Sequence, residues 1–138
     1  MKRTFTLSKQ ERLKSRKLIE QLFRQGKSIS VFPYRALYLP VAGGDAQLPF
    51  SLQAGITVSS KNFKKAVHRN KIKRLTREAY RLQKPALQQK LTETGQQLML
   101  FLIYTGKEIP DFSLAKEKVQ VILDKLIHRI DENHPPHT

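Results

Sequence analysis

The spacing of apolar residues predicts strands in the middle of the chain, with helices before, between and after them. Apolar positions at helical spacing indicate a helix over residues 16–25, and Gly26 follows it as a stop signal. Loose alternation over residues 28–40 predicts one or two strands, and clearer alternation predicts another over residues 51–59. A continuous apolar run at 97–104 indicates a central strand that is covered on both faces.

Two longer helices complete this pattern. The basic segment 64–81 is expected to be helical and to end before Pro85, with an extra turn of helix in the polar residues that follow. Asp111 or Ser113 is placed to cap a last helix that runs to about residue 130. The expected buried stripe of that helix is Leu114, Val119, Ile122, Leu123, Leu126, Ile127 and Ile130. This order of elements predicts an α+β or α/β sandwich in which the basic helix crosses over between two strands of one sheet.

The basic helix separates cations from aliphatic side chains. At about 100° per residue, its main polar positions fall within one arc: Arg69, Asn70, Lys73, Arg74, Arg77 and Arg81. The apolar positions lie almost opposite: Ile72, Leu75, Ala79 and Leu82. Such a helix can cover a sheet with its aliphatic side and present Arg and Lys to a phosphate backbone. Glu78, the sole acid in the segment, is placed to pair with Arg74 or Arg81.

The positive charge of the chain is concentrated in two segments. The 138 residues include 26 Lys and Arg against 11 Asp and Glu, a formal net charge of +15. Residues 2–27 carry +7 and residues 61–81 carry +8, so the rest of the chain is neutral. A focused charge of one sign indicates a site for a polyanion. The length suits one domain, which we expect to span residues 1–138 with flexible ends at 1–7 and 132–138.

The residue patterns that most enzyme classes need are missing from the sequence. There is no Cys, and the 11 carboxylates show no paired arrangement for acid–base or two-metal chemistry. The four His residues lack metal-binding spacing, and no phosphate-binding glycine motif occurs. The longest apolar run, Leu98–Tyr104, is too short to span a bilayer, and no signal peptide is visible. We therefore expect a cytoplasmic protein.

Cations close to aromatic residues favour nucleic-acid binding over the other functions considered. Bases stack on aromatic rings while phosphates pair with Lys and Arg. Candidates for an open sheet face of this kind are Phe23, Tyr34, Tyr38, Thr57 and Ser59. Which tyrosine points outward stays open, because the sequence does not fix the strand register. Two alternatives also stay open: a structural, ribosomal-type protein that neutralises folded RNA, and a DNA-binding or membrane-surface protein.

The segment GITVSSKNFKKAVHRNKIKRLTREAYR (55–81) closely resembles the signature of the bacterial ribonuclease P protein subunit. That family has a strand ending in small polar residues, then Lys, then an Arg-rich helix. The matching positions are Lys61, Ala66, Val67, Arg69, Asn70, Lys73, Arg74, Arg77, Glu78, Tyr80 and Arg81. Lys71 departs from the pattern, since the family usually has Arg there, and Lys lacks the planar fork for a bidentate contact.

The resemblance implies the family's αβββαβα two-layer sandwich, with one mixed sheet and a left-handed βαβ crossover through the basic helix. Ribonuclease P is an endonuclease that removes the 5′ leader of precursor tRNA and leaves a 5′-phosphate. Its RNA subunit performs the hydrolysis with Mg²⁺ that the RNA binds. The resemblance therefore implies a monomeric accessory protein that binds no metal alone and joins the ribonuclease P RNA in a 1:1 complex. Precursor tRNA would be its second partner.

The resemblance also assigns roles to residues of this chain. The RNA contacts would be Lys61, Lys64, Lys65, Arg69, Asn70, Lys71, Lys73, Arg74, Arg77 and Arg81. The cleft for the single-stranded leader, between the first helix and the sheet, would include Ile19, Phe23, Tyr34, Tyr38, Thr57 and Ser59. Ile19 occupies a position where the family often has Phe, so one stacking surface is expected to be weaker here.

Overall fold

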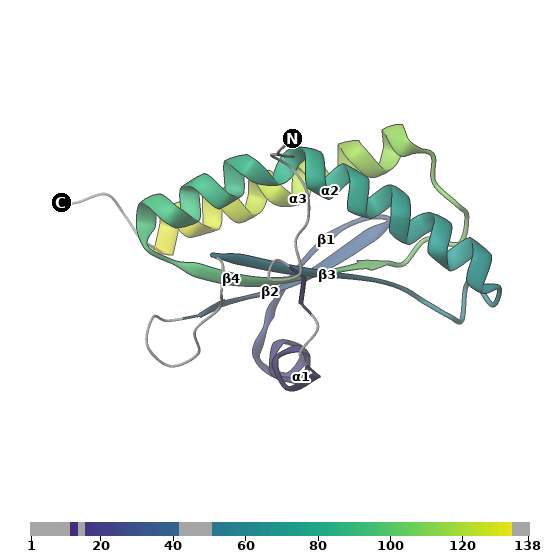
Figure 1. Ribbon diagram of the computed structural model, residues 1–138, viewed down its shortest axis with the longest axis horizontal. Coiled ribbons are helices and arrows are strands. Elements are labelled where there is room, and N and C mark those ends of the chain that lie inside the picture. Colours follow the sequence, from purple (N-terminus) through teal and green to yellow (C-terminus); the bar gives the residue numbers. More distant parts are fainter. Residues whose placement is uncertain (1–11, 14–15, 42–50, 134–138) are drawn as a thin grey trace, which may run out of the picture.

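A mixed four-stranded sheet separates two helical layers of unequal size (Figure 1). The computed structural model describes residues 12–13, 16–41 and 51–133. Its elements are α1 (Arg16–Gln25), β1 (Lys27–Val31), β2 (Tyr34–Val41), β3 (Leu52–Val58), α2 (Ala66–Thr94), β4 (Gln97–Tyr104) and α3 (Phe112–Asn133). The predicted α+β fold with the order αβββαβα is confirmed. Of the ends expected to be flexible, residues 1–7 and 134–138 lie outside the described residues.

The sheet has the strand order β1-β2-β4-β3. β1 pairs with β2 and β2 with β4 in antiparallel fashion, whereas β3 and β4 are parallel. Because parallel neighbours need a crossover connection, α2 links β3 to β4 across one face of the sheet. The segment 28–40, for which one or two strands were expected, contains two: β1 and β2, joined by a turn at Phe32 and Pro33. The Thr105 backbone N–H donates to the Pro33 carbonyl at 2.8 Å and ties this turn to the end of β4.

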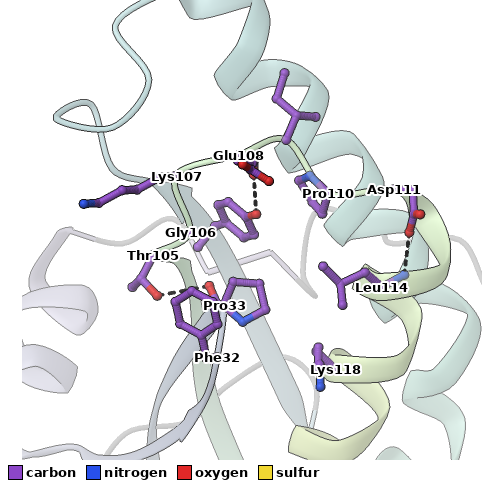
Figure 2. A pocket seen from close by; sticks show the side chains of 12 residues that line it. Phe32, Pro33, Thr105, Gly106, Lys107, Glu108, Pro110, Asp111, Leu114 and Lys118 are labelled. Atoms are coloured by element: carbon purple, nitrogen blue, oxygen red, sulfur yellow. Dashed lines mark hydrogen bonds between the residues drawn. The ribbon is translucent and has the colours of Figure 1, made fainter.

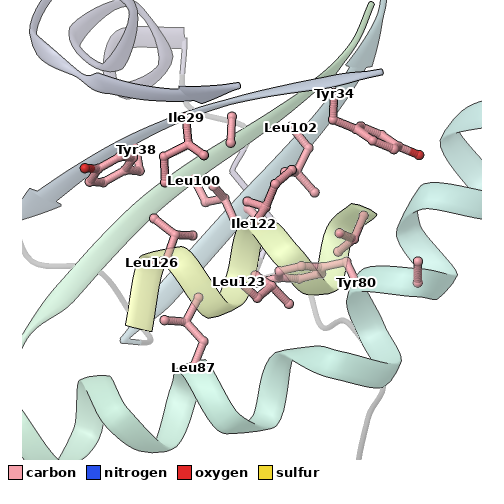
Figure 3. Close-up of a cluster of buried hydrophobic side chains, with 14 of the residues drawn as sticks. Ile29, Tyr34, Tyr38, Tyr80, Leu87, Leu100, Leu102, Ile122, Leu123 and Leu126 are labelled. Carbon is pink, nitrogen blue, oxygen red and sulfur yellow. The ribbon is translucent and has the colours of Figure 1, made fainter. Parts of the chain in front are cut away.

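The main core fills the space between the sheet and the α2–α3 pair (Figure 3). Leu100 and Leu102 of β4 point to this side and are fully buried, as is Ile122 of α3. The predicted stripe of α3 is confirmed, with Leu114 and Ile127 half-buried at its edges. Asp111 caps the helix, since its carboxylate accepts a 2.8 Å hydrogen bond from the Leu114 N–H.

α1 lies on the face of the sheet opposite to α2 and α3 (Figure 1), and a second, smaller core is packed between α1 and the sheet. Leu22 of α1 is fully buried there with Leu37 of β2 and Met99 of β4. β4 thus supplies alternate side chains to two cores, so its continuous apolar run is explained by burial on both faces. The prediction of a covered central strand is confirmed.

α2 is longer than its sequence pattern predicts, because the helix continues through Pro85 to Thr94. A proline inside a helix costs about 3 kcal/mol. Leu87 and Leu91, both fully buried in the main core, lie beyond it, and burying each contributes about 1.5–3 kcal/mol. The helix ends at Gly95, whose φ of 66° is left-handed, and the Gln96 N–H returns to the Leu91 carbonyl at 2.9 Å.

The buried stripe of α2 is also rotated from the predicted one. Ile72 and Ala79 are fully buried as expected, but Leu82 is 39% exposed and Leu75 is half-buried. Thr76 and Tyr80 take their places in the core. The Tyr34 and Thr76 hydroxyls are 2.7 Å apart and hydrogen-bonded. A threonine can therefore occupy this buried position, because its hydroxyl has a partner from the sheet.

Candidate nucleic-acid interface

The cations predicted to bind RNA lie on and just before the half of α2 that precedes Pro85. Most are exposed: Lys61, Lys64, Lys65, Lys71, Arg74 and Arg77, with Asn70 among them. Arg69, Lys73 and Arg81 are half-buried. These ten residues are called the basic surface below. Because Ile72, Thr76 and Ala79 face the core, the helical period carries the intervening cations away from it.

The start of α2 is unusually positive for a helix N-terminus. Lys65 occupies the N-cap position and makes no side-chain capping bond, and the first turn contains no acidic residue. Cations near a helix N-terminus oppose the helix dipole, which is worth about 0.3–1 kcal/mol per charge at an exposed site. Arg69 reaches back to stabilise this end, since its guanidinium donates to the Phe63 and Lys64 carbonyls at 2.7 and 2.9 Å. The local arrangement therefore favours an anion from outside the chain.

The acids in the described part of the chain leave most of the basic surface without an ion-pair partner. Glu78 pairs with Arg81, with Arg81 Nε donating to the carboxylate at 3.1 Å. This hydrogen bond is the main cause that lowers the pKa of Glu78 and raises that of Arg81. Within the described residues, no ion pair joins Lys73, Arg74 or Arg77 to an acid. Of the two partners predicted for Glu78, the structure selects Arg81.

The predicted cleft residues divide between the two faces of the sheet. Ile19 and Phe23 project from α1, and Thr57 lies on the face of β3 that turns toward α1, the face called the α1 face below. Phe23 is 54% exposed and meets Phe101 edge to face, with ring centroids 5.5 Å apart. Ile19, Glu20, Phe23 and Arg24 border a surface hollow of about 500 Å³. Of the described residues, only side chains of α1 border this hollow, where the exposed Phe23 ring lies beside the cation of Arg24.

Tyr34 and Tyr38 do not line this face, and their prediction as cleft residues is wrong. Both side chains point to the α2–α3 side, where they are 1% and 3% exposed. Burial raises the pKa of the Tyr34 phenol to about 12. The Tyr38 hydroxyl accepts a 2.6 Å hydrogen bond from Arg129 of α3. The strand register places both tyrosines on the α2–α3 side, because even-numbered positions of β2 face these two helices.

Ser59 follows β3 and has a local structural role. Its hydroxyl accepts a hydrogen bond from the Lys61 N–H at 3.2 Å, and its carbonyl accepts one from the Phe63 N–H at the same distance. These bonds shape the turn that leads from β3 into α2. Ser59 therefore lies between the α1 face and the basic surface and belongs wholly to neither.

Residues that the sequence interpretation missed complete the α1 face. Phe101 and Ile103 of β4 lie there, next to Leu39 and Arg35 of β2. Gly55 makes room for the Phe101 ring, since a Cβ at residue 55 would lie 2.5 Å from that ring. The apolar run 97–104 predicted burial on both faces, and its odd-numbered members could have been assigned to α1 once the register was known.

A Ribonuclease P family model matches residues 7–129 of the chain. The chain belongs to the bacterial ribonuclease P protein family. The ribonuclease P protein component of Porphyromonas gingivalis is 37% identical over 132 residues, which cover 96% of this chain and 91% of that protein. The corresponding component of Chlorobium phaeobacteroides is 33% identical and covers 91% and 88% of the two chains. The solved RNase P protein from Thermotoga maritima superimposes with a TM-score of 0.61 at 29% identity, over 83% of this chain and 96% of that one.

As a ribonuclease P protein component, the chain is a subunit of the ribonuclease P holoenzyme and assists removal of the 5′ leader from precursor tRNA. Membership implies partnership with the ribonuclease P RNA and a family whose catalysis depends on Mg²⁺. Among the described residues, no three His, Asp or Glu side chains come together where they could hold a metal ion. No helix in the described part of the chain is long and apolar enough to cross a membrane.

Proposed function

We propose that the basic surface binds the ribonuclease P RNA and that the α1 face holds the single-stranded leader of precursor tRNA. The RNA subunit carries out the Mg²⁺-dependent hydrolysis, and the protein joins it as a monomer in a 1:1 complex. The observation that carries this proposal is the row of exposed cations on α2, most of which have no acidic partner among the residues that the structure describes. Salt bridges within the protein would otherwise be the usual way to stabilise so charged a helix.

The chemistry of α2 suits a folded RNA backbone. Arg74 and Arg77 present planar guanidinium groups, which pair with phosphate through two parallel hydrogen bonds. Lys71, where the family usually has Arg, contributes charge without this geometry. Because α2 is anchored along its length by buried residues up to Leu91, the cations are held on a rigid support. Little conformational entropy is then lost when the helix meets RNA.

The chemistry of the α1 face suits a single strand. Phe23 offers an exposed ring that is held against Phe101, and base stacking on such a ring is tolerant of sequence. Arg24 supplies a cation beside the same hollow, and Thr57 supplies a hydroxyl at the edge of β3. An isoleucine at position 19 gives apolar contact without stacking, so Phe23 is expected to carry most of the base contact on α1.

A reconstituted cleavage assay tests the proposal as a whole. Precursor tRNA is incubated with the protein alone, with the ribonuclease P RNA alone and with both, over a range of Mg²⁺ concentrations. We expect no cleavage by the protein alone, and cleavage by the complex at lower Mg²⁺ than the RNA alone requires. Cleavage that follows the RNA-free protein through purification would refute the assignment of catalysis to the RNA.

The role of the α1 face has its own readout in the same system. The complex is expected to bind precursor tRNA more tightly than mature tRNA, because only the precursor carries a leader. Equal affinities would favour a structural RNA-binding role in which the protein neutralises RNA and contacts no leader. Native mass spectrometry of the complex checks the 1:1 stoichiometry.

A further inference from the structure

A second hollow, distinct from the α1 face, opens at the far end of the sheet (Figure 2). It has a volume of about 750 Å³ and lies between the β1–β2 turn, the segment 105–111 after β4, and the start of α3. Its walls include Phe32, Pro33, Tyr104 and Ile109, with Lys107, Glu108 and Lys118 contributing charge. Its size falls within the range of small-molecule sites, which is about 300–1,000 Å³.

Hydrogen bonds fix two of the walls of this hollow, the β1–β2 turn and the segment after β4. The Thr105 N–H and hydroxyl both donate to the Pro33 carbonyl, at 2.8 and 3.1 Å. The Tyr104 hydroxyl donates to the Glu108 carbonyl and closes the loop over the end of β4. Gly106 is required by close packing, since a Cβ there would lie 2.6 Å from the Tyr104 hydroxyl. These contacts fix the β1–β2 turn and the segment after β4 relative to the end of the sheet.

An aromatic ring stands at its edge with most of its surface in solvent. Phe32 is 76% exposed and is the most exposed large apolar side chain in the described part of the chain, and Ile109 on the facing segment is 37% exposed. Lys107 belongs to the lining, and its exposed side chain extends outward from the loop, away from Pro110 and Leu114 (Figure 2). Burial raises the pKa of the Tyr104 phenol, and the negative charge of Glu108 raises it further.

The hollow adjoins the basic surface through a direct link. The Asn62 side-chain amide donates to the Thr105 and Gly106 carbonyls at 3.3 and 3.2 Å. Asn62 lies between Lys61 and Lys64, at the start of the basic surface. An RNA that contacts these lysines therefore passes beside the wall of the hollow.

We propose that this hollow binds an unpaired nucleotide of the ribonuclease P RNA, with its base stacked on Phe32 and its phosphate paired with Lys107. The inference rests on the proposed function, because it extends the RNA contact from α2 to the end of the sheet. Glu108 also lines the hollow and is exposed, and its carboxylate would accept a hydrogen bond from an exocyclic amino group of the base. The Lys118 ammonium lies 3.6 Å from Glu117, and the Asp111 carboxylate caps α3, so these two charges have partners within the protein.

An exposed ring beside a lysine suits a nucleotide better than an apolar peptide. Aromatic rings next to cations hold unpaired bases by stacking while the cations meet the phosphates. An apolar peptide would gain little from Lys107 and would lie next to a surface whose net charge attracts RNA. A second copy of the chain is the other possible occupant of the hollow, and the dependence of Trp fluorescence on protein concentration tests it.

Tryptophan fluorescence tests the stack directly, because the chain contains no Trp. Phe32→Trp places a single reporter in the hollow, and His128→Trp is a matched exposed control on α3, 16 residues after its first residue. Titration with ribonuclease P RNA is expected to quench the emission of Trp at position 32 and to leave the control almost unchanged. Equal responses at the two positions would overturn the proposal. A blue shift that grows with protein concentration without RNA would also overturn it, because a second copy would then fill the hollow.

Affinity measurements give the second arm. Phe32→Ala is expected to weaken RNA binding about 5- to 100-fold without changing the salt dependence, since a stacked base releases no counterion. Lys107→Gln should lower the salt slope by roughly 0.7–0.9. Thermal melting confirms that each variant folds.

The outcomes separate the hollow from the wider interface. If the Phe32→Ala variant binds RNA within twofold of the original chain, while Arg77→Gln still lowers the salt slope, the hollow is not an RNA-binding site but the basic surface is. If no cation of α2 affects RNA binding, the proposed function fails and this inference fails with it.

Discussion

Arg77 and Arg81 lie one helical turn apart on α2 and differ in exposure and in their acidic partners, which RNA binding should detect. Arg81 is paired with Glu78, whereas Arg77 is exposed and has no acidic partner among the described residues. Replacing either by Gln removes one positive charge. A long-range charge effect would treat the two changes alike, but a direct phosphate contact would not.

The expected magnitude follows from counterion release. Each phosphate contact contributes roughly 0.7–0.9 to the steepness of log K against log salt. Between about 50 and 200 mM salt, a protein with one more contact therefore loses about threefold more affinity than a protein without it. Arg77→Gln is expected to lower the slope by that amount. Arg81→Gln should lower it by less than half as much, because its guanidinium is already neutralised by Glu78. Glu78→Gln frees Arg81 and should raise the slope.

Filter binding or fluorescence anisotropy with ribonuclease P RNA, repeated at several salt concentrations, measures these slopes. Circular dichroism of each variant controls for loss of helix. The reasoning is refuted if Arg81→Gln and Arg77→Gln give the same slope while Glu78→Gln gives none of the expected increase. The pair would then have no bearing on RNA binding, and the cations of α2 would act only through their total charge.

Two further variants test the α1 face and the core. Phe23→Ala should weaken binding of precursor tRNA to the complex by about 1–3 kcal/mol and leave mature tRNA unaffected; an equal loss for both would place Phe23 outside the leader contact. Tyr34→Phe should change the alkaline stability of the protein. Burial raises the pKa of Tyr34 from 10 to about 12, so the folded state keeps a proton that the unfolded state loses above pH 10. The original chain should therefore lose about 2 kcal/mol more than the variant between pH 10 and 12 in urea unfolding, and parallel pH profiles would contradict this.

The sequence predicted secondary structure best in segments where the spacing of apolar residues fits a single strand or helix. The strand at 97–104 and the stripe of α3 were predicted because each apolar run has a single explanation, burial. The end of α2 was not predicted, since Pro85 is a local signal and the compensating burial of Leu87 and Leu91 is a tertiary effect. Helix propensity depends only on residues close in sequence, so it does not include the tertiary contacts that these leucines make in the main core.

The two tyrosines of β2 show a different limit. A shift of one residue in strand register exchanges the faces of every side chain, and no feature of segment 28–40 fixes that register. Tyr34 and Tyr38 are amphipathic, so their composition suits either a core or a binding face. The structure gives both hydroxyls partners on the helical side, Thr76 and Arg129, and this assigns them to the core.

The start of α2 could be recognised from sequence because it breaks rules that favour a stable helix. Lys64 and Lys65 stand where an acid or a capping side chain would be stabilising, and the structure supplies neither. Violations of this kind concentrate at functional sites, where binding energy from a partner offsets the local cost. The hollow at Phe32 carries no such signal, because it is assembled from three segments that are distant in sequence. A site whose residues are unfavourable for their own helix can therefore be predicted from the sequence. A site built from segments that are distant in sequence can be found only once the fold is known.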